Sequence, residues 1–186
     1  MTGNPGVGKH TIAEFVVEKI EGAEIIDINK IAIEGNAILR KDTRYGIDID
    51  IKKLSKLMTD ELRRAKDLVI TGHLAPYVLK ATQIDLVIIL RRSPYELTQV
   101  FEQRKYLPEK IRENVASEIL DIYLYDALKN FGKDKIAEFD TTGKTPKYVA
   151  DEIISLLQKK RRGTIGIVDW LSLVYKKGDV KNFLEY

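Results

Sequence analysis

The sequence predicts an α/β protein, in which a parallel sheet is covered by helices on both faces. Three observations support this class. Segments with helical periodicity alternate with short apolar segments along the 186 residues. Two of the apolar segments, 67–71 and 84–90, are continuously hydrophobic, as expected for strands buried on both faces. A glycine-rich turn directly precedes the first helical segment, a typical junction between a strand and a crossover helix.

The first half of the chain has one segment that is difficult to interpret. Gly22 ends the first helix, and the next helix is amphipathic. Residues 29–49 combine glycines with mixed charges and show no clear period. The expected elements are a helix over 9–21, a strand over 23–28, a helix over 50–66 and a strand over 67–71.

The second half is clearer. Ser93, Pro94 and Glu96 form a helix start, with a capping serine, a first-turn proline and a glutamate three residues after the cap. Pro146 opens the last helix of the body. The expected elements are a strand over 84–90, helices over 93–105 and 109–131, a strand over 135–140, a loop over 141–146 and a helix over 146–160.

The glycine-rich turn has the form of a phosphate-binding loop. Two glycines five residues apart precede a lysine, so the backbone can direct several N–H groups at an anion. The helix that follows adds its positive N-terminal end, and Lys9 can reach the terminal phosphates of a nucleotide. The expected nucleotide-binding residues here are Gly3, Asn4, Pro5, Gly6, Val7, Gly8, Lys9, His10 and Thr11.

The start of the sequence raises a structural question. A strand is expected before the loop, yet only Met1 and Thr2 precede Gly3. Either the given chain starts later than the fold unit, or another segment fills the position. The apolar run 164–169 either packs against the body or replaces the first strand, and packing is the favoured prediction because a late central strand is topologically awkward.

Composition restricts the chemistry. The chain has no cysteine, which excludes disulfides, thiolate nucleophiles and cysteine-bound zinc, and its two histidines are too few for a histidine-rich metal site. No apolar run reaches the length of a membrane span and no signal peptide precedes the loop, so we expect a cytoplasmic protein without membrane contact.

Charge is unevenly distributed. The net charge of +3 divides into −1 for residues 1–158 and +4 for residues 159–186. A basic tail is either a solvated terminus, the more common case, or a contact for RNA or an acidic surface. The tail is also too apolar around Trp170 for a disordered end, so we expect it to fold onto the body.

Several motifs together resemble a known family. The loop reads G-x-P-G-x-G-K-x-T, as in nucleoside monophosphate kinases, and no guanine-reading N-K-x-D follows. The chain as a whole is similar to archaeal-type adenylate kinases and the adenylate kinase isoenzyme 6 family, whose eukaryotic members are also ribosome-assembly ATPases. The segments that carry the resemblance are 85–91 (DLVIILR), 104–106 (RKY), 110–114 (KIREN) with 118–119, and 140–146 (DTTGKTP).

The resemblance implies a fold and a domain organisation. The fold is a P-loop nucleoside-kinase-like three-layer sandwich with a parallel sheet, a short lid and an added C-terminal tail. Residues 1–160 would form the kinase domain, with an acceptor-nucleotide region at about 27–66 and a lid at about 102–114. Residues 161–186 would be a basic and apolar extension that the resemblance does not cover.

The resemblance also implies roles for residues. Lys9 and Arg104 would be catalytic, with Arg112 a second candidate in the lid. Arg40 or Arg44 would hold the acceptor phosphate, although a surface arginine is more often simply solvated. The loop 141–146 would lie beside the donor adenine, where the expected binding residues are Thr142, Gly143 and Lys144.

Two positions depart from the pattern expected for magnesium. His10 stands where a hydroxyl commonly reaches the ion, and Thr71 stands at an acidic position of the family, two residues before His73. Magnesium would then be held mainly by ATP oxygens and water, or the site is degenerate. His73 is either part of the site or a histidine hydrogen-bonded at a strand end.

Two further features each allow two interpretations. Asp140 ends a strand as active-site carboxylates do, but we favour a role in ordering its own loop as an Asx-type turn. The pair Arg91–Arg92 ends the most apolar strand, where it could bind phosphate or form an ion pair with an acidic side chain.

The sequence therefore predicts an ATP-dependent nucleoside monophosphate kinase that converts ATP and AMP to two ADP with Mg²⁺, and slow ATPase activity is an accompanying expectation. The alternative is an ATP-binding assembly factor that escorts a small-subunit ribosomal protein or rRNA, an idea that rests on the resemblance and the basic tail. A degenerate nucleotide-binding module is the third hypothesis, because of His10 and Thr71.

Overall fold

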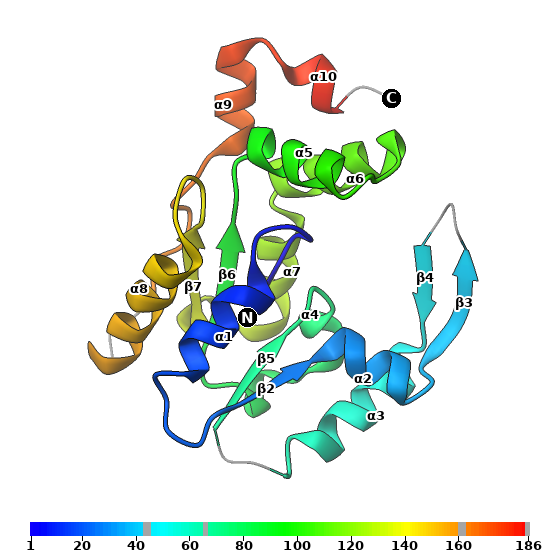
Figure 1. The fold of residues 1–186 in the computed structure, drawn as a ribbon, viewed down its shortest axis with the longest axis vertical. Helices are drawn as coiled ribbons and strands as arrows, with labels where there is room; N and C mark the ends of the chain where they lie inside the picture. Colours follow the sequence, from blue (N-terminus) through cyan, green and yellow to red (C-terminus); the bar gives the residue numbers. More distant parts are fainter. Residues whose placement is uncertain (43–45, 65–66, 160–162, 185–186) are drawn as a thin grey trace.

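The computed structural model describes residues 1–42, 46–64, 67–159 and 163–184, and it is an α/β fold built around parallel strands (Figure 1). The strands are β1 (Thr2–Gly3), β2 (Glu24–Asp27), β3 (Ile38–Asp42), β4 (Gly46–Ile49), β5 (Leu68–Thr71), β6 (Val87–Arg91) and β7 (Ile136–Asp140). The α-helices are α1 (Lys9–Val17), α2 (Ile28–Glu34), α3 (Ile51–Glu61), α4 (Ala75–Val78), α5 (Pro94–Gln103), α6 (Pro108–Ile119), α7 (Ile122–Phe131), α8 (Pro146–Lys159), α9 (Trp170–Lys177) and α10 (Val180–Leu184). Short 3₁₀ turns occupy Ala81–Gln83 and Lys133–Lys135.

The parallel strands form two ladders that meet at the N-terminus. β6 lies between β1 and β7, and β2 pairs with β5. Met1 joins the ladders, because its amino group donates to the Ile70 carbonyl at 2.6 Å and its own carbonyl accepts from the Gly72 amide at 3.2 Å. The expected first strand is therefore present as the two residues of β1. Residues of β1, β5 and β6 contribute to the lining of a cavity of about 530 Å³.

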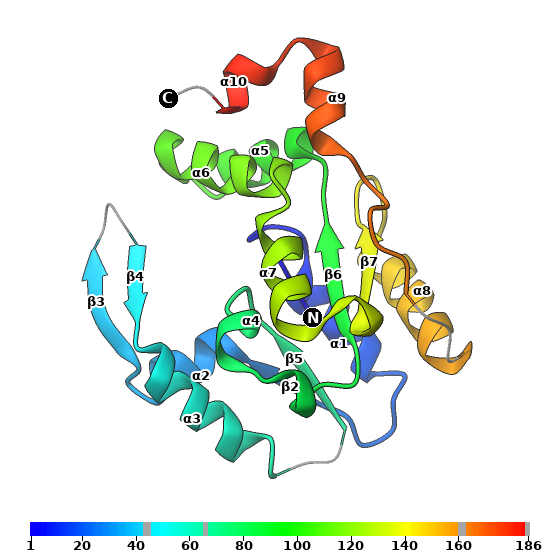
Figure 2. The same ribbon diagram turned by 180° about the vertical axis from the view of Figure 1, so that it is seen from behind.

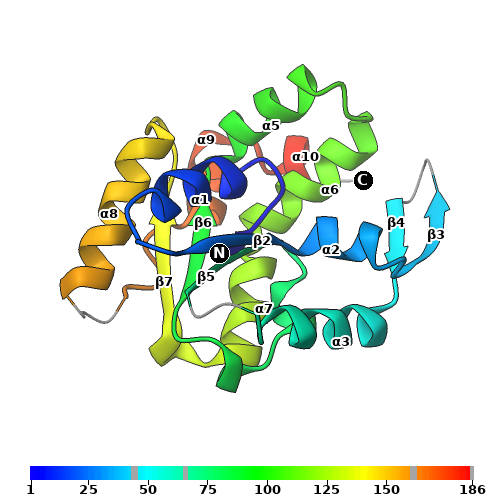
Figure 3. The same cartoon turned by 60° about the horizontal axis from the view of Figure 1, so that its bottom comes forward.

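Helices cover both faces of the strands. α1 packs against α8 on one face, and α4 and α7 pack together on the other. Figure 1 shows α1 and α8 in front of the strands, Figure 2 brings α7 to the front, and Figure 3 shows α1 and α7 on opposite sides. The most apolar strand, β6, is buried along its whole length and contributes side chains to the cores on both faces. The predicted fold class is confirmed.

The segment 29–49, which the sequence left uninterpreted, contains most of α2 and the antiparallel strands β3 and β4, which project from the body as a hairpin (Figure 1). The side chain of Asp27 caps α2, accepting hydrogen bonds from the Asn29 and Lys30 amides. Leu39 and Arg40 of β3 and Asp48 of β4 are exposed, so burial does not impose on these strands the regular apolar pattern by which a strand is recognised in a sequence.

The single helix predicted over 109–131 is wrong. The structure has two helices, α6 and α7, separated by Leu120 and Asp121. Asp121 has a φ of 57°, a left-handed conformation that ends one helix and redirects the chain into the next. The apolar period continues through this break because α6 and α7 both pack against the body, so periodicity alone did not reveal it.

The tail folds back onto the body, as predicted. The Thr164 carbonyl accepts from the Glu138 amide at 2.9 Å, so the run 164–169 lies along the outer edge of β7 and does not replace β1. Ile165 and Ile167 remain exposed on this edge. The tail then forms α9 and α10, which cover α5 and α6 (Figure 2). In the described part of the chain, no helix is long and apolar enough to cross a membrane.

Candidate nucleotide site

The glycine-rich loop connects β1 to α1 and has the backbone that the spacing predicts. Gly8 is the N-cap of α1 in the left-handed conformation, with a φ of 93°. Gly3 has a φ of 131°, and a Cβ there would lie 2.4 Å from the Leu90 carbonyl oxygen. The loop can therefore curl against β6 only with glycine at these positions, and its amides open toward the N-terminus of α1.

Lys9 bends back over the loop that precedes it. Its Nζ donates to the carbonyls of Gly3 at 3.0 Å and Asn4 at 2.7 Å. The pKa of Lys9 is lowered to about 8, mainly by burial and to a smaller extent by the nearby charge of Arg104, while Glu118 and Asp27 act in the opposite direction. An anionic partner would therefore stabilise the ammonium group more than the two neutral carbonyls do.

This lowered pKa predicts that ATP binding weakens in alkaline solution. Free Lys9 loses its proton near pH 8, whereas bound phosphates favour its charged form, so binding above pH 8 must take up a proton. The dissociation constant of ATP should then rise by up to about tenfold per pH unit above pH 8. Calorimetric titrations from pH 7 to 10 would measure this. Lys9→Arg should remove the pH dependence, because guanidinium stays protonated.

Other contacts fix the loop from two sides. The Asn4 side-chain amide donates to the Asn114 carbonyl in α6, and Val7 is buried in the core. The Arg92 guanidinium donates to the Gly6 carbonyl at 3.3 Å and pairs with Glu96 at 2.9 Å. Pro5 is partly buried, and Thr11 and His10 are exposed in the first turn of α1.

The loop 141–146 is built close to the phosphate loop. Asp140 accepts from the Thr142 amide at 2.9 Å and from its hydroxyl at 2.6 Å, which confirms the Asx-type turn. Thr142 also accepts from the Ser93 amide, and the Gly143 amide donates to Glu96 at 2.9 Å. Lys144 pairs with Glu152 at 3.1 Å on the surface.

Glu96 was not among the predicted site residues, yet it connects both loops. One of its carboxylate oxygens accepts from Gly143, and the other pairs with Arg92, which in turn contacts Gly6. In the sequence, Glu96 appears only as the acidic residue of a helix start. Its position four residues after Arg92, at the end of a strand, could have indicated this role, because a carboxylate there can pair with Arg92.

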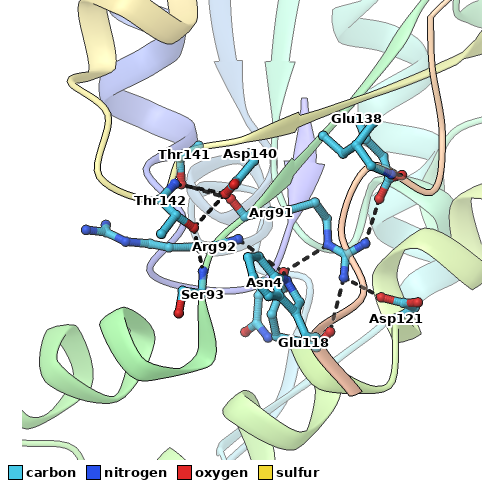
Figure 4. Close-up of polar contacts among 12 residues, drawn as sticks. Asn4, Arg91, Arg92, Ser93, Glu118, Asp121, Glu138, Asp140, Thr141 and Thr142 are labelled. Atoms are coloured by element: carbon cyan, nitrogen blue, oxygen red, sulfur yellow. Dashed lines mark hydrogen bonds and ion pairs between the residues drawn. The ribbon is translucent and has the colours of Figure 1, made fainter. Parts of the chain in front are cut away.

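Arg91 lies at the centre of a buried ionic network beneath the site (Figure 4). It pairs with Glu118 at 2.9 Å, with Glu138 at 2.6 Å and with Asp121. Glu118 also accepts from the Arg92 amide and from the Trp170 indole N–H at 3.1 Å. Of the two alternatives for Arg91, the ion pair is confirmed. Burial raises the pKa of Glu118, while Arg91 and the other donors oppose that rise.

The predicted arginines differ in their positions. Arg104 ends α5 on the surface and lies near enough to Lys9 to lower its pKa. Arg112 is exposed on α6, and Arg40 is exposed on β3. Arg44 lies outside the described residues. The structure therefore brings Arg104 toward the phosphate loop and places Arg40 on the projecting hairpin.

His73 lies close to the loop, just beyond β5. Its pKa is lowered to about 4, mainly by burial and to a smaller extent by the charge of Lys9, while Asp27 opposes the change. Its ring meets Tyr123 edge to face at 6.4 Å. The Thr71 hydroxyl is buried and lies 3.5 Å from the Ile26 carbonyl. The described residues contain no cluster of three or more histidine, aspartate or glutamate side chains that could hold a metal by themselves.

Comparison with known proteins agrees with this geometry. A family model described as an AAA domain matches residues 1–121. Archaeal proteins named "Putative adenylate kinase" are similar to this chain over most of their length. The chain is 38% identical to the one from Thermococcus kodakarensis, covering 91% of this chain and 90% of that protein. It is 35% identical to that of Pyrococcus furiosus, over 91% and 89%, and 33% identical to that of Methanocaldococcus jannaschii, over 91% and 90%.

Proposed function

Because the chain belongs to the P-loop family of these archaeal adenylate kinase-like proteins, and is thus a nucleotide kinase, we propose that it transfers a phosphoryl group from ATP to AMP, giving two ADP. A slow hydrolysis of ATP would accompany this transfer. We further propose residues 1–160 as the kinase domain, with the acceptor nucleotide bound by 27–66 and the lid formed by 102–114.

The observation that carries the proposal is the placement of Lys9. Its ammonium group is held over the loop by two carbonyls at 2.7 and 3.0 Å, at the positive end of α1. Phosphoryl transfer needs positioning and positive charge around the migrating group and no protein nucleophile. Lys9 would exchange the two carbonyls for phosphate oxygens, while the amides of Gly6 to Thr11 hold the remaining phosphates.

The remaining residues fit the same reaction. Arg104 would stabilise the charge of the transferring phosphoryl group, since it already acts electrostatically on Lys9. The ordered turn at Thr142, Gly143 and Lys144 would border the donor adenine. Arg40 and Arg44 would meet the acceptor phosphate, with Arg112 as a second lid residue.

Magnesium fits the oxygen donors of this region. Mg²⁺ prefers oxygen ligands and is usually held by phosphates, water and one or two carboxylates. The Thr11 hydroxyl is an oxygen donor in the first turn of α1, two residues after Lys9, whereas His10 supplies nitrogen. When bound, the ion would neutralise charge on the phosphates.

We predict that Arg104→Ala slows turnover much more than it weakens ATP binding. Because this exposed arginine would act on the transition state, its removal should lower kcat by at least about a hundredfold, with little change in the dissociation constant of ATP. Steady-state kinetics and calorimetry would separate the two effects. Arg112→Ala, on the neighbouring helix α6, tests the second lid arginine in the same way and should lose less activity.

The direct test of the proposed function is ADP formation from ATP with a panel of nucleoside monophosphates. We expect ADP production with AMP, and comparison with dAMP and CMP would define the acceptor. If the purified protein binds ATP but forms no ADP with any acceptor, the kinase proposal is wrong.

A second candidate is an ATP-binding assembly factor for a small-subunit ribosomal protein or rRNA. It is favoured by the surface of α9, where Leu171 and Tyr175 are exposed beside Lys176 and Lys177, because interleaved aromatic and basic side chains suit RNA. Pull-down from cell extract with and without ATP would test it. Recovery of no ribosomal component in either case would count against this role.

A further inference from the structure

One carboxylate near the phosphate loop has no role in the function proposed so far. Asp27 ends β2, and its register partner on β5 is Thr71. Thr71 is the position at which the family resemblance implies an acidic residue. Adjacent strands lie about 4.8 Å apart. The carboxylate of Asp27 is therefore one strand away from position 71, where the acidic residue is expected, and at the same position along the strands.

The orientation of Asp27 is fixed by the helix that it caps. Its Oδ1 accepts from the Asn29 amide at 2.8 Å and from the Lys30 amide at 3.4 Å. Its Oδ2 lies 3.8 Å from the Nδ1 of His10, in the first turn of α1. His10 directly follows Lys9, where phosphate-loop proteins commonly carry the hydroxyl that reaches magnesium. The second oxygen of Asp27 therefore faces the position of that hydroxyl.

The surroundings also suit a hydrated ion. The side chain of Asp27 is 30% exposed, so water can reach it, and the side chain of His10 is 61% exposed and can turn away. The carboxylate is near enough to favour the charged forms of both Lys9 and His73. α1 packs against both β2 and β5, which places the ends of the two strands at one site.

We propose that Asp27 holds the magnesium ion of bound ATP, through water, in place of the acidic residue that is absent at Thr71. This inference rests on the proposed function, because it assumes that nucleotide binds at the loop. In this chain, the carboxylate that holds magnesium would thus be on β2, at the position paired with Thr71 of β5.

Asp27→Asn tests the proposal with little effect on folding, since asparagine caps helices as well as aspartate does. Electron paramagnetic resonance would measure Mn²⁺ binding in the presence of a non-hydrolysable ATP analogue. We expect the variant to bind Mn²⁺ about 10- to 100-fold more weakly. Its affinity for ATP in EDTA should be unchanged or higher, because a negative charge near the phosphates has been removed.

Two further variants complete the experiment. Glu14→Gln removes the other carboxylate beside His10, at 3.4 Å, and should leave Mn²⁺ affinity unchanged. Asp27→Asn combined with Thr71→Asp should regain Mn²⁺ affinity by restoring the carboxylate on β5. Unchanged Mn²⁺ binding in Asp27→Asn, or an equal loss in Glu14→Gln, would overturn the inference alone. Failure of the unaltered protein to bind ATP, with or without metal, would instead contradict the proposed function.

Discussion

Lys9→Ala is expected to reduce ADP formation from ATP and AMP by at least about a hundredfold to a thousandfold. Lys9 supplies the positive charge that the loop carbonyls of Gly3 and Asn4 hold over the site, and an alanine leaves no cation at that point. Arg104 cannot replace it, because it lies on the exposed end of α5. A coupled assay of ADP production at saturating ATP would measure the loss.

The fold should tolerate this change. Burial disfavours the charged form of Lys9, so replacing this side chain removes a charge that is costly in the folded protein. Among the residues that the structure describes, no buried acidic group relies on Lys9 as its sole partner, and the melting temperature should therefore shift by only a few degrees. Lys19→Ala is the matched control, a lysine just beyond the other end of α1 that pairs with Asp151 on the surface. Equal activity loss in both variants would show that Lys9 has no special role.

The phosphate loop could be predicted from the sequence because its geometry depends on local residues. Glycines at 3 and 8 are required by a close approach to β6 and by a left-handed helix cap, and both requirements are visible in the spacing. The Asx-type turn at Asp140 is equally local, since it links an aspartate to a residue two positions later. The binding roles of these residues remain predictions.

The ionic network could not be predicted in the same way. Arg91 finds its partners 27 to 47 residues away, on α6, at the break before α7 and on β7. The break itself depends on Asp121, whose left-handed backbone directs a carboxylate to Arg91, and this requirement is tertiary. Two interpretations of Arg91 were therefore open from the sequence, and only the packing of these elements decides between them.

The proposed role of Asp27, on β2, in place of an acidic residue on β5 could also not be predicted from the sequence, for a different reason. Thr71 and His10 looked like losses when each position was compared with the expected motif by itself. The register of β2 against β5 places Asp27 beside Thr71, but register is not readable from two short strands 44 residues apart. A motif lost at one position can thus be restored by a neighbour in space.

Arg91→Met is expected to destabilise the protein by about 3–5 kcal/mol, the usual cost of leaving buried charges without their partner. Glu118 and Glu138 are 2% and 3% exposed, and both depend on the guanidinium. The loss should reach the tail, because the Trp170 indole donates to Glu118 and the Gly166 amide donates to Glu138. Urea unfolding monitored by tryptophan fluorescence would report both effects, since Trp170 is the sole tryptophan.

The pH dependence of this variant distinguishes an electrostatic cause from a packing defect. Without Arg91, burial raises the pKa of Glu118 in the folded state above its unfolded value, so the folded protein binds more protons and its stability falls as pH rises. The destabilisation should therefore be smaller at pH 5 than at pH 8. The charge-balanced variant Arg91→Met, Glu118→Gln, Glu138→Gln should recover much of the stability and lose this pH dependence. A loss that is the same at both pH values, and unchanged in the balanced variant, would assign the effect to packing alone.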